Sequence, residues 1–446
     1  MWTVTQLARD LETGRTSSRE LVEQALARIA DPAGEGGRAF LKVYADAARA
    51  DADHADALRK RGARRSLVDG LPVSLKDLFD VAGDITRAGS KLYAQKATQD
   101  AVAVARLRAA GAVFVGRTNM VEFAFGGVGL NPHYGTPRNP WDRKQGRVPG
   151  GSSSGAAVAQ ADGMCVMALG SDTRGSIRGP SALCGVVGFK PTQRRVSREG
   201  AFPLSFELDS VGPLANSVEC CAAYDAVLSG EGDGSLRAVE LKGLRFLLPR
   251  SSAIAELDRD VADAFDRALT AIGAKGASLA EVAMPAFDRQ AEYFKGGGFA
   301  GAEAYYIHRE RLSRLEEFDP RVGKRVLLGK DLSGADYVAL GFLRKAYQAE
   351  VEAAMQGFDA FLMPSAPCVA PTIAEASESD EAYFRWNARL LRNHGLVNFL
   401  DGCAVSVPCH EPGGAPVGLM VCAPAARDRR LLEVAAAIER ALPRRR

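Results

Sequence analysis

The order of apolar and polar positions along the chain predicts alternating strands and helices. The stretch Ser-Ser-Arg-Glu at 17–20 is typical of a helix-capping box, and the apolar residues after it recur at helical spacing. Further along, short apolar runs of strand length alternate with helical patterns. The expected strands are 71–75, 113–115 and 164–169, and the expected helices are 43–60, 101–110 and one beginning at Ala156. This alternation favours a parallel or mixed sheet with helices on both faces.

The second half of the chain places a long helical stretch between two groups of strand candidates. The expected elements there are a strand at 245–249, a helix at 254–272, strands at 361–363, 404–407 and 417–421, and a closing helix at 428–441. No block rich in proline, glycine and serine divides the chain, and no repeat is present, so a single α/β domain is predicted. Its expected parts are an N-terminal helical part (1–65), a core (66–250), a helical insertion (284–357) and C-terminal strands with a helix (358–446).

Composition and charge narrow the classes of function. The chain has 446 residues, of which 47% are hydrophobic and 25% charged, which is ordinary for a protein with a large core. The net charge is +3, and only the C-terminus is rich in arginine, so no nucleic-acid-binding surface is expected. The N-terminus lacks a long apolar run, and no run of about 20 apolar residues occurs. We therefore expect neither a signal peptide nor a membrane span, and we expect the protein to be cytoplasmic.

The eight cysteines indicate buried thiols in a reducing environment. They form no C-x-x-C pair, and most lie in apolar runs such as GMCVMAL and GCAVSVPC. This pattern favours small hydrophobic core residues over a disulfide framework or a zinc site.

Three short stretches carry candidate chemistry. The first is LPVSLKD at 71–77, where Lys76 ends an apolar strand. A lysine in that position can extend its ammonium group to solvent. Alternatively, burial disfavours the charged form, lowers the pKa and leaves a neutral amine that can act as a base.

The second stretch is PGGSSSG at 149–155, which leads directly into the helical AAVAQA. It fits a flexible loop with a serine N-cap. A phosphate-binding loop is excluded because no lysine follows Gly155. The other interpretation is a set of hydroxyl groups held at a turn where glycine allows unusual backbone angles.

The third stretch is GSDTRGSIRGP at 170–180, which follows an expected strand. Successive amides at such a bend can converge on an oxyanion beside a nucleophilic Ser176, although serine needs a base. The residues around Ser176 do not fit the G-x-S-x-G motif, and no histidine stands in a recognisable motif, so a Ser-His-Asp triad is not expected. The histidines are His54, His133, His308, His394 and His410.

Together these stretches resemble the amidase signature family. Its other landmarks are similar to GRTNM at 116–120, NPWD at 139–142, LDSVGP at 208–213 and PVGL at 416–419, so the resemblance covers nearly the whole chain. The resemblance implies that Ser176 is the nucleophile and Lys76 the base. It further implies that Ser152 relays the proton and is joined to Gly151 by a cis peptide bond.

The resemblance also suggests how substrate is held. The backbone amides from Thr173 to Ser176, including those of Arg174 and Gly175, would bind the oxyanion. The segment after the Thr-Asn pair would face the substrate, and Ala124 is the position carried over. Neither a metal nor a cofactor is implied.

Arg174 departs from the family, which mostly has glycine in this turn. Its side chain is expected to point to solvent or to a neighbouring carboxylate. The alternative is that its guanidinium grips an anionic or polar substrate, because the planar fork suits carboxylates. Asp172 and Arg178 match positions that are usually structural, and an internal ion pair is expected for them.

The function expected is hydrolysis of the C–N bond of a small carboxylic amide, as in stand-alone bacterial amidases. Two alternatives remain open: a glutaminase-type A subunit of a tRNA-dependent amidotransferase, and a hydrolase of a urea-like or biuret-like compound. The expected partner is a small-molecule amide. Neither nucleic acid nor membrane is expected as a partner, and a homodimer is a state that the family often adopts.

Overall fold

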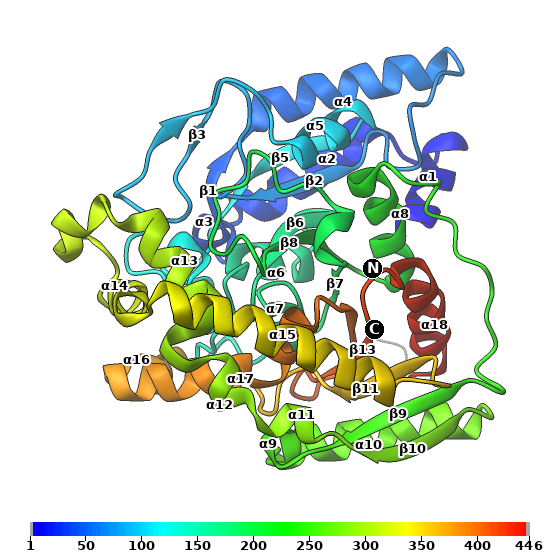
Figure 1. Ribbon diagram of the computed structural model, residues 1–446. Helices are drawn as coiled ribbons and strands as arrows, with labels where there is room; N and C mark the ends of the chain where they lie inside the picture. Colours follow the sequence, from blue (N-terminus) through cyan, green and yellow to red (C-terminus); the bar gives the residue numbers. More distant parts are fainter. Residues whose placement is uncertain (1–2, 443–446) are drawn as a thin grey trace.

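A single mixed sheet of eleven strands forms the centre of the protein (Figure 1). The computed structural model describes residues 3–442. Across the sheet the strand order is β1-β5-β2-β6-β8-β7-β12-β13-β11-β9-β10. The strands are β1 (Phe40–Val43), β2 (Pro72–Lys76), β5 (Val113–Thr118), β6 (Met167–Asp172), β7 (Val187–Lys190), β8 (Ser210–Ala215), β9 (Arg245–Arg250), β10 (Ser278–Ala283), β11 (Ala360–Pro364), β12 (Cys403–Pro408) and β13 (Gly418–Ala423). A separate ribbon consists of β3 (Ile85–Thr86) and β4 (Gln95–Lys96).

Helices lie between the strands in sequence and around the sheet in space. Those before β9 are α1 (Val4–Glu12), α2 (Ser18–Ala30), α3 (Gly36–Ala39), α4 (Ala45–Lys60), α5 (Val102–Ala109), α6 (Ser154–Ala161), α7 (Arg178–Cys184) and α8 (Val218–Ser229). Those after it are α9 (Ser252–Ala255), α10 (Arg259–Ala274), α11 (Pro285–Asp288), α12 (Gln290–Tyr293), α13 (Gly298–His308), α14 (Pro320–Leu327), α15 (Gly334–Ala354), α16 (Ile373–Ser377), α17 (Asp380–Leu400) and α18 (Asp428–Ala441). Short 3-10 helices are η1 (Glu122–Ala124), η2 (Gln193–Arg195), η3 (Lys295–Gly297), η4 (Arg311–Glu317) and η5 (Leu328–Asp331).

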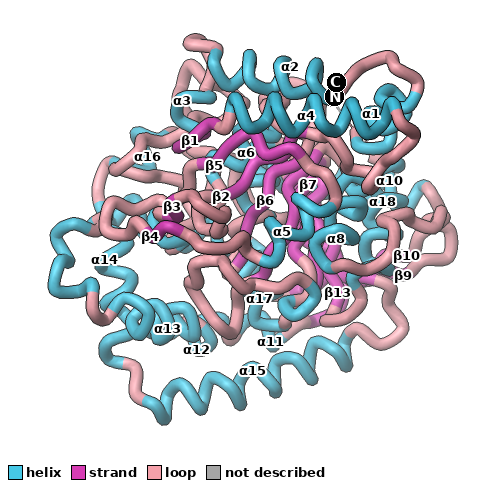
Figure 2. The backbone as a smooth tube through the Cα atoms, turned by 90° about the horizontal axis from the view of Figure 1, so that it is seen from above, coloured by secondary structure: helices cyan, strands magenta, loops and turns pink. Residues whose placement is uncertain are grey.

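Both faces of the sheet are covered, as the alternation of side chains along β11 shows. Phe361 and Met363 belong to a core cluster with residues of α15 and α17, whereas Leu362 belongs to a cluster with residues of α10 and α18. Side chains of a strand point alternately to opposite faces, so these helices cover opposite sides. In Figure 2, α15 runs along the bottom of the view, whereas α10 and α18 lie toward its right-hand side. The predicted α/β domain with a sheet covered on both faces is confirmed.

Several strands that are buried on both faces were predicted from the sequence. Every residue of β2, β6, β12 and β13 is buried, and their sequences are mostly apolar. The closing helix begins and ends where the pattern predicted, at 428 and 441. The predicted capping box of α2 is present, with Ser17 and Glu20 each bonded to the other's backbone amide.

The prediction of one helix over 254–272 was wrong, because the structure has the short α9 and the separate α10 there. Asp258 between them is extended, its amide donates to the carbonyl of Pro367, and its carboxylate accepts from the amide of Val369. These bonds to a distant loop outweigh the local helical pattern.

Strands β7 and β8 were not predicted, because their sequences VGFK and SVGPLA contain glycine or proline and give a weak strand signal.

Two further expectations from the sequence concern the cysteines and membrane-spanning helices. All eight cysteines are buried and free of disulfides, which confirms their expected place in the core. Within residues 3–442, none of the helices combines the length and the apolar character needed to cross a membrane.

Candidate active site

Lys76 and the turn that contains Ser176 lie at the same edge of the sheet. Lys76 is the last residue of β2, and the turn starts directly after β6. The two strands are parallel neighbours, so their carboxyl ends emerge side by side. This is the edge at which ligands bind in many α/β folds.

The Lys76 ammonium group is fully buried and contacts two hydroxyl groups. Its Nζ lies 2.8 Å from Ser152 Oγ and 2.9 Å from Ser171 Oγ. Burial lowers the pKa of Lys76 to about 7, although the charges of Asp209 and Asp172 oppose this shift. Of the two interpretations that the sequence left open, the structure excludes the solvent-directed lysine, because the side chain is fully enclosed.

The glycine- and serine-rich loop places Ser152 against Lys76. The peptide bond between Gly151 and Ser152 is cis, as the family resemblance implied. The Ser152 carbonyl accepts a hydrogen bond of 3.0 Å from the amide of Val121. The loop then continues into α6, whose residues 154–160 are all buried against the sheet.

Ser176 is almost completely buried and lies beside this loop. The amide of Ser153 donates to the Ser176 carbonyl at 3.3 Å, which fixes the distance between the two turns. Among residues 3–442, no hydrogen bond joins the hydroxyls of Ser152 and Ser176. The structure thus brings the three predicted residues to one place, with the Lys76–Ser152 contact already formed.

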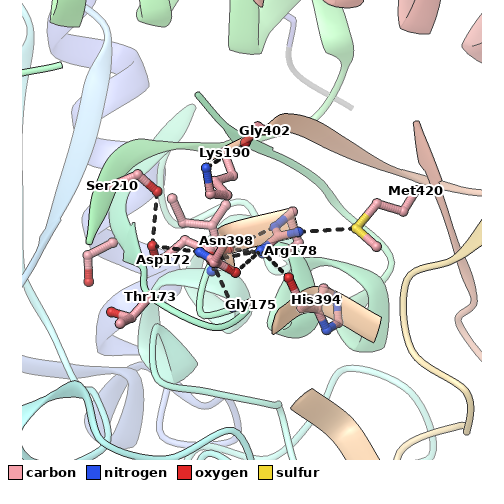
Figure 3. Close-up of polar contacts among 12 residues, drawn as sticks. Asp172, Thr173, Gly175, Arg178, Lys190, Ser210, His394, Asn398, Gly402 and Met420 are labelled. Atoms are coloured by element: carbon pink, nitrogen blue, oxygen red, sulfur yellow. Dashed lines mark hydrogen bonds and ion pairs between the residues drawn. The ribbon is translucent and has the colours of Figure 1, made fainter. Parts of the chain in front are cut away.

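Asp172 makes hydrogen bonds that hold the turn containing Ser176 in place (Figure 3). Its carboxylate accepts hydrogen bonds from the amides of Gly175 (2.7 Å) and Ile177 (3.1 Å). It also pairs with the buried Arg178 at 2.9 Å, as the sequence predicted, and accepts from Asn398 Nδ2 at 2.9 Å. Although burial opposes ionisation, the Arg178 charge and these hydrogen bonds hold the pKa of Asp172 far below its ordinary value.

Gly175 fits this turn because it has no side chain. Its φ of +116° is rarely adopted by other residues, and a Cβ there would lie 2.6 Å from Cβ of His394. The Gly175 amide already donates a hydrogen bond to Asp172. To bind the oxyanion as expected, it would have to share its hydrogen between Asp172 and the oxyanion. The amides of Thr173, Arg174 and Ser176 have no acceptor within the described part of the chain.

Thr173 is positioned by a carboxylate that the sequence did not single out. Its hydroxyl donates to Asp209, whose other oxygen accepts from the amides of Leu204 (2.9 Å) and Ser205 (3.1 Å). Asp209 lies within the LDSVGP landmark, so the signal was present in the sequence without an assigned role.

A small cavity of about 10 Å³ opens beside Ser176, which is room for about one water molecule. Ala124 lines it, in the segment where the resemblance expected substrate contact, with an unusual φ of +60°. The other lining residues are Phe125, Gly126, Thr173, Arg174, Leu204, Ala300, Arg325 and Leu391. A substrate larger than water enters only if some of these side chains shift.

Arg174 does not have the surroundings that the sequence led us to expect. Its guanidinium carbon lies 3.8 Å from the ring centre of Phe294, and it lines the cavity. Within residues 3–442 it has no carboxylate partner, and its Nε is buried without a hydrogen bond. Burial lowers the pKa of Arg174 to about 9, and the charge of Arg325 contributes to this lowering. The expectation of a solvent-facing or carboxylate-paired side chain is therefore wrong.

Arg325 is a second cavity residue, which the sequence did not reveal. It belongs to α14 of the helical insertion, and its guanidinium carbon lies 4.4 Å from the ring centre of Phe125. Its Nε is buried without a partner. Burial lowers the pKa of Arg325 from its ordinary value. Within residues 3–442, no cluster of histidine, cysteine and acidic side chains could hold a metal ion.

Comparisons with known proteins show the family to which the chain belongs. Residues 20–432 match the family model described as Amidase. The chain is 36% identical over 397 residues to 2-amino-5-chloromuconic acid deaminase of Comamonas testosteroni, covering 88% of this chain and 86% of the relative. It is 34% identical over 481 residues to the A subunit of glutamyl-tRNA(Gln) amidotransferase from Synechococcus sp. (strain CC9605), covering 98% and 96%.

A solved structure described as an amidase superposes with a TM-score of 0.89 at 35% identity, covering 99% of this chain and all of that one (100%). Fold, motifs and relatives therefore define the class of protein. The chain belongs to the amidase family and is a hydrolase of that family.

The turn geometry yields a test with a matched pair of glycines. Gly175→Ala should lower the stability of the folded state by about 1–3 kcal/mol through backbone strain, and the clash with His394 adds to this cost. Gly179→Ala is the control, because a Cβ there meets the same histidine at an ordinary 3.6 Å. Thermal unfolding measures both. Equal melting temperatures for the two variants would contradict the strain assigned to the turn.

Proposed function

We propose that the protein hydrolyses the C–N bond of a small carboxylic amide through an acyl intermediate on Ser176. The contact of 2.8 Å between Lys76 Nζ and Ser152 Oγ carries this proposal, because it places a buried amine of low pKa beside a relay hydroxyl. A serine nucleophile needs such a base, and no histidine lines the cavity within the described residues.

The first half-reaction forms the acyl-enzyme. Neutral Lys76 accepts the proton of Ser152, and Ser152 accepts the proton of Ser176, whose Oγ attacks the amide carbon. The resulting oxyanion is held by amides of the turn, where each donor is worth about 3 kcal/mol. As the C–N bond breaks, the proton returns through Ser152 to the leaving nitrogen, so a primary amide releases ammonia.

The second half-reaction hydrolyses the ester. Water loses a proton to the same relay, attacks the acyl carbon and releases the carboxylic acid with Ser176 protonated again. All atoms and charges balance with the substrate and water alone. Asp172 and Asp209 act as positioning residues, because Asp172 accepts a hydrogen bond from the turn and Asp209 accepts one from the Thr173 hydroxyl.

The second candidate is a glutaminase-type A subunit, which is favoured by 34% identity to such a protein over 98% of the chain. The two functions differ in the need for other chains. Ammonia release by the purified chain alone from simple amides supports the free amidase. Ammonia release that occurs only from glutamine and only with added partner subunits supports the second candidate. Urea and biuret in the same panel of substrates test the remaining alternative, a hydrolase of a urea-like or biuret-like compound.

The nucleophile can be tested by intact-protein mass. Incubation with an amide and hydroxylamine-trappable acyl donors should give an acyl adduct that maps to Ser176, with ammonia released in parallel. Ser176→Ala should form no adduct and lose essentially all turnover, and Ser153→Ala in the same loop is the control. Near-normal turnover by Ser176→Ala would exclude the mechanism.

The role of Lys76 predicts a pH profile. Protonation of the amine removes the base, so kcat/KM should fall about tenfold per pH unit below the pKa of about 7 and level off above it. Asp209→Asn should move the midpoint to lower pH, because the negative charge of Asp209 raises the pKa of Lys76. A profile without an acid limb near pH 7 would contradict Lys76 as the base.

A further inference from the structure

Glu303 is a buried carboxylate that the mechanism above does not use. It belongs to α13 of the helical insertion, and only 4% of it is exposed. Its carboxylate accepts hydrogen bonds from the Tyr337 hydroxyl of α15 at 2.7 Å, from the Ser205 hydroxyl, and from the Glu207 amide at 3.4 Å. Within residues 3–442 it has no ion-pair partner. Hydrogen bonds alone therefore hold this charge in the interior.

The loop at 203–209 continues these bonds to the turn that contains the nucleophile. The Ser205 amide donates to Asp209 at 3.1 Å, and the hydroxyl of the same serine reaches Glu303. Asp209 also accepts from the hydroxyl of Thr173, the first residue of that turn. A continuous chain of hydrogen bonds thus joins the helical insertion to the nucleophile turn.

This arrangement is costly for the fold. Burial raises the pKa of Glu303, and the charge of Asp209 raises it further. Burial also raises the pKa of Asp209. An apolar side chain at position 303 would avoid the cost of burying a second negative charge. A buried polar network with every member hydrogen-bonded holds its parts in one arrangement, so this chain fixes the loop relative to both α13 and the turn.

We propose that Glu303 is a positioning residue for the reaction at Ser176, acting through Ser205 and Asp209 on Thr173. The proposal rests on the amidase function above and adds a residue to it. Thr173 lines the cavity beside Ser176, and within residues 3–442 its amide has no acceptor, so this amide is available to the oxyanion. A shift of about 1 Å in such a group lowers a rate by about 100-fold. Losing the anchor of the Thr173 hydroxyl therefore slows catalysis.

The test breaks the chain at Glu303 and then restores it without the charge. Glu303→Leu removes both acceptor oxygens and should lower kcat about 10- to 100-fold for the simple amide that the wild-type enzyme hydrolyses fastest. Glu303→Gln should stay within about threefold of the wild-type kcat, because its amide can accept from Ser205 and donate to the Tyr337 hydroxyl. The measurement is ammonia release at saturating substrate.

Glu207→Gln is the matched control. It changes a carboxylate of the same loop that is 47% exposed and pairs with Arg344 at 2.8 Å, and it leaves the amide that donates to Glu303 in place. It should alter kcat less than about threefold, as expected for an exposed ion pair. Melting temperatures report folding. Ser205→Ala breaks the same chain from the loop side and replaces Glu303→Leu if that variant does not fold.

A double-mutant cycle with Thr173→Val tests the path. If Glu303 acts through Thr173, Glu303→Leu should lower kcat less than about threefold once the Thr173 hydroxyl is absent, because effects along one chain are not additive. Losses that multiply in the double variant overturn the proposal. A Glu303→Gln enzyme as slow as Glu303→Leu overturns it as well.

Hydrogen exchange separates this proposal from the amidase function. In Glu303→Leu the backbone amides of both 203–209 and 172–178 should exchange faster than in the wild type, and Glu207→Gln should leave both segments unchanged. Faster exchange in both segments, with no ammonia release by the wild type, supports the positioning of the turn and overturns the amidase. Ammonia release by the wild type, with unchanged exchange at 172–178 in Glu303→Leu, overturns the positioning role and leaves the amidase intact.

Discussion

The buried ion pair between Asp172 and Arg178 is the interaction on which the site depends. Both side chains are fully buried, and breaking such a pair by removing one partner costs about 3–5 kcal/mol. The carboxylate is bonded to the backbone of the nucleophile turn, and the guanidinium reaches Asn398 Oδ1 at 2.6 Å and the carbonyl of His394 at 3.2 Å on α17. One pair of charges thus links β6, the turn, α7 and a helix more than 200 residues later in the sequence.

Lys76 differs from Lys190, another buried lysine, in the groups that its side chain contacts. Lys190 is held by the carbonyls of Pro191 (2.8 Å) and Gly402 (2.7 Å), which accept hydrogen bonds from its ammonium group. Lys76 instead contacts two hydroxyls, and hydroxyls can donate as well as accept. Its neutral form therefore keeps hydrogen-bond partners, which suits a group that exchanges a proton.

The sequence predicted the parts of the site that lie within single short segments. Lys76, Ser152 and Ser176 each stand in a stretch whose local composition indicates a strand end or a turn, and the structure places them together. Arg325, Phe294 and Asn398 were beyond reach, because nothing in their own segments marks them and only the fold brings them to the turn. The same reason explains the wrong prediction of one helix over 254–272. There, hydrogen bonds between Asp258 and residues 367–369 override a local helical pattern. Local signals together with the family resemblance thus predicted the candidate chemistry, and long-range packing decided the shape of the pocket.

Because the cysteines are buried, their chemical modification can report transient exposure of the protein interior. Burial raises the pKa of Cys165 and Cys368 to about 12, so their thiolate forms are scarce near neutral pH. Alkylating reagents and oxidants then reach these sulfurs only during transient exposure of the interior. Cys165 borders α6 and Cys368 follows β11, on opposite sides of the nucleophile turn in sequence. The rate at which each thiol is modified therefore measures how often the interior is exposed near α6 and after β11, with the native residues as the reporters.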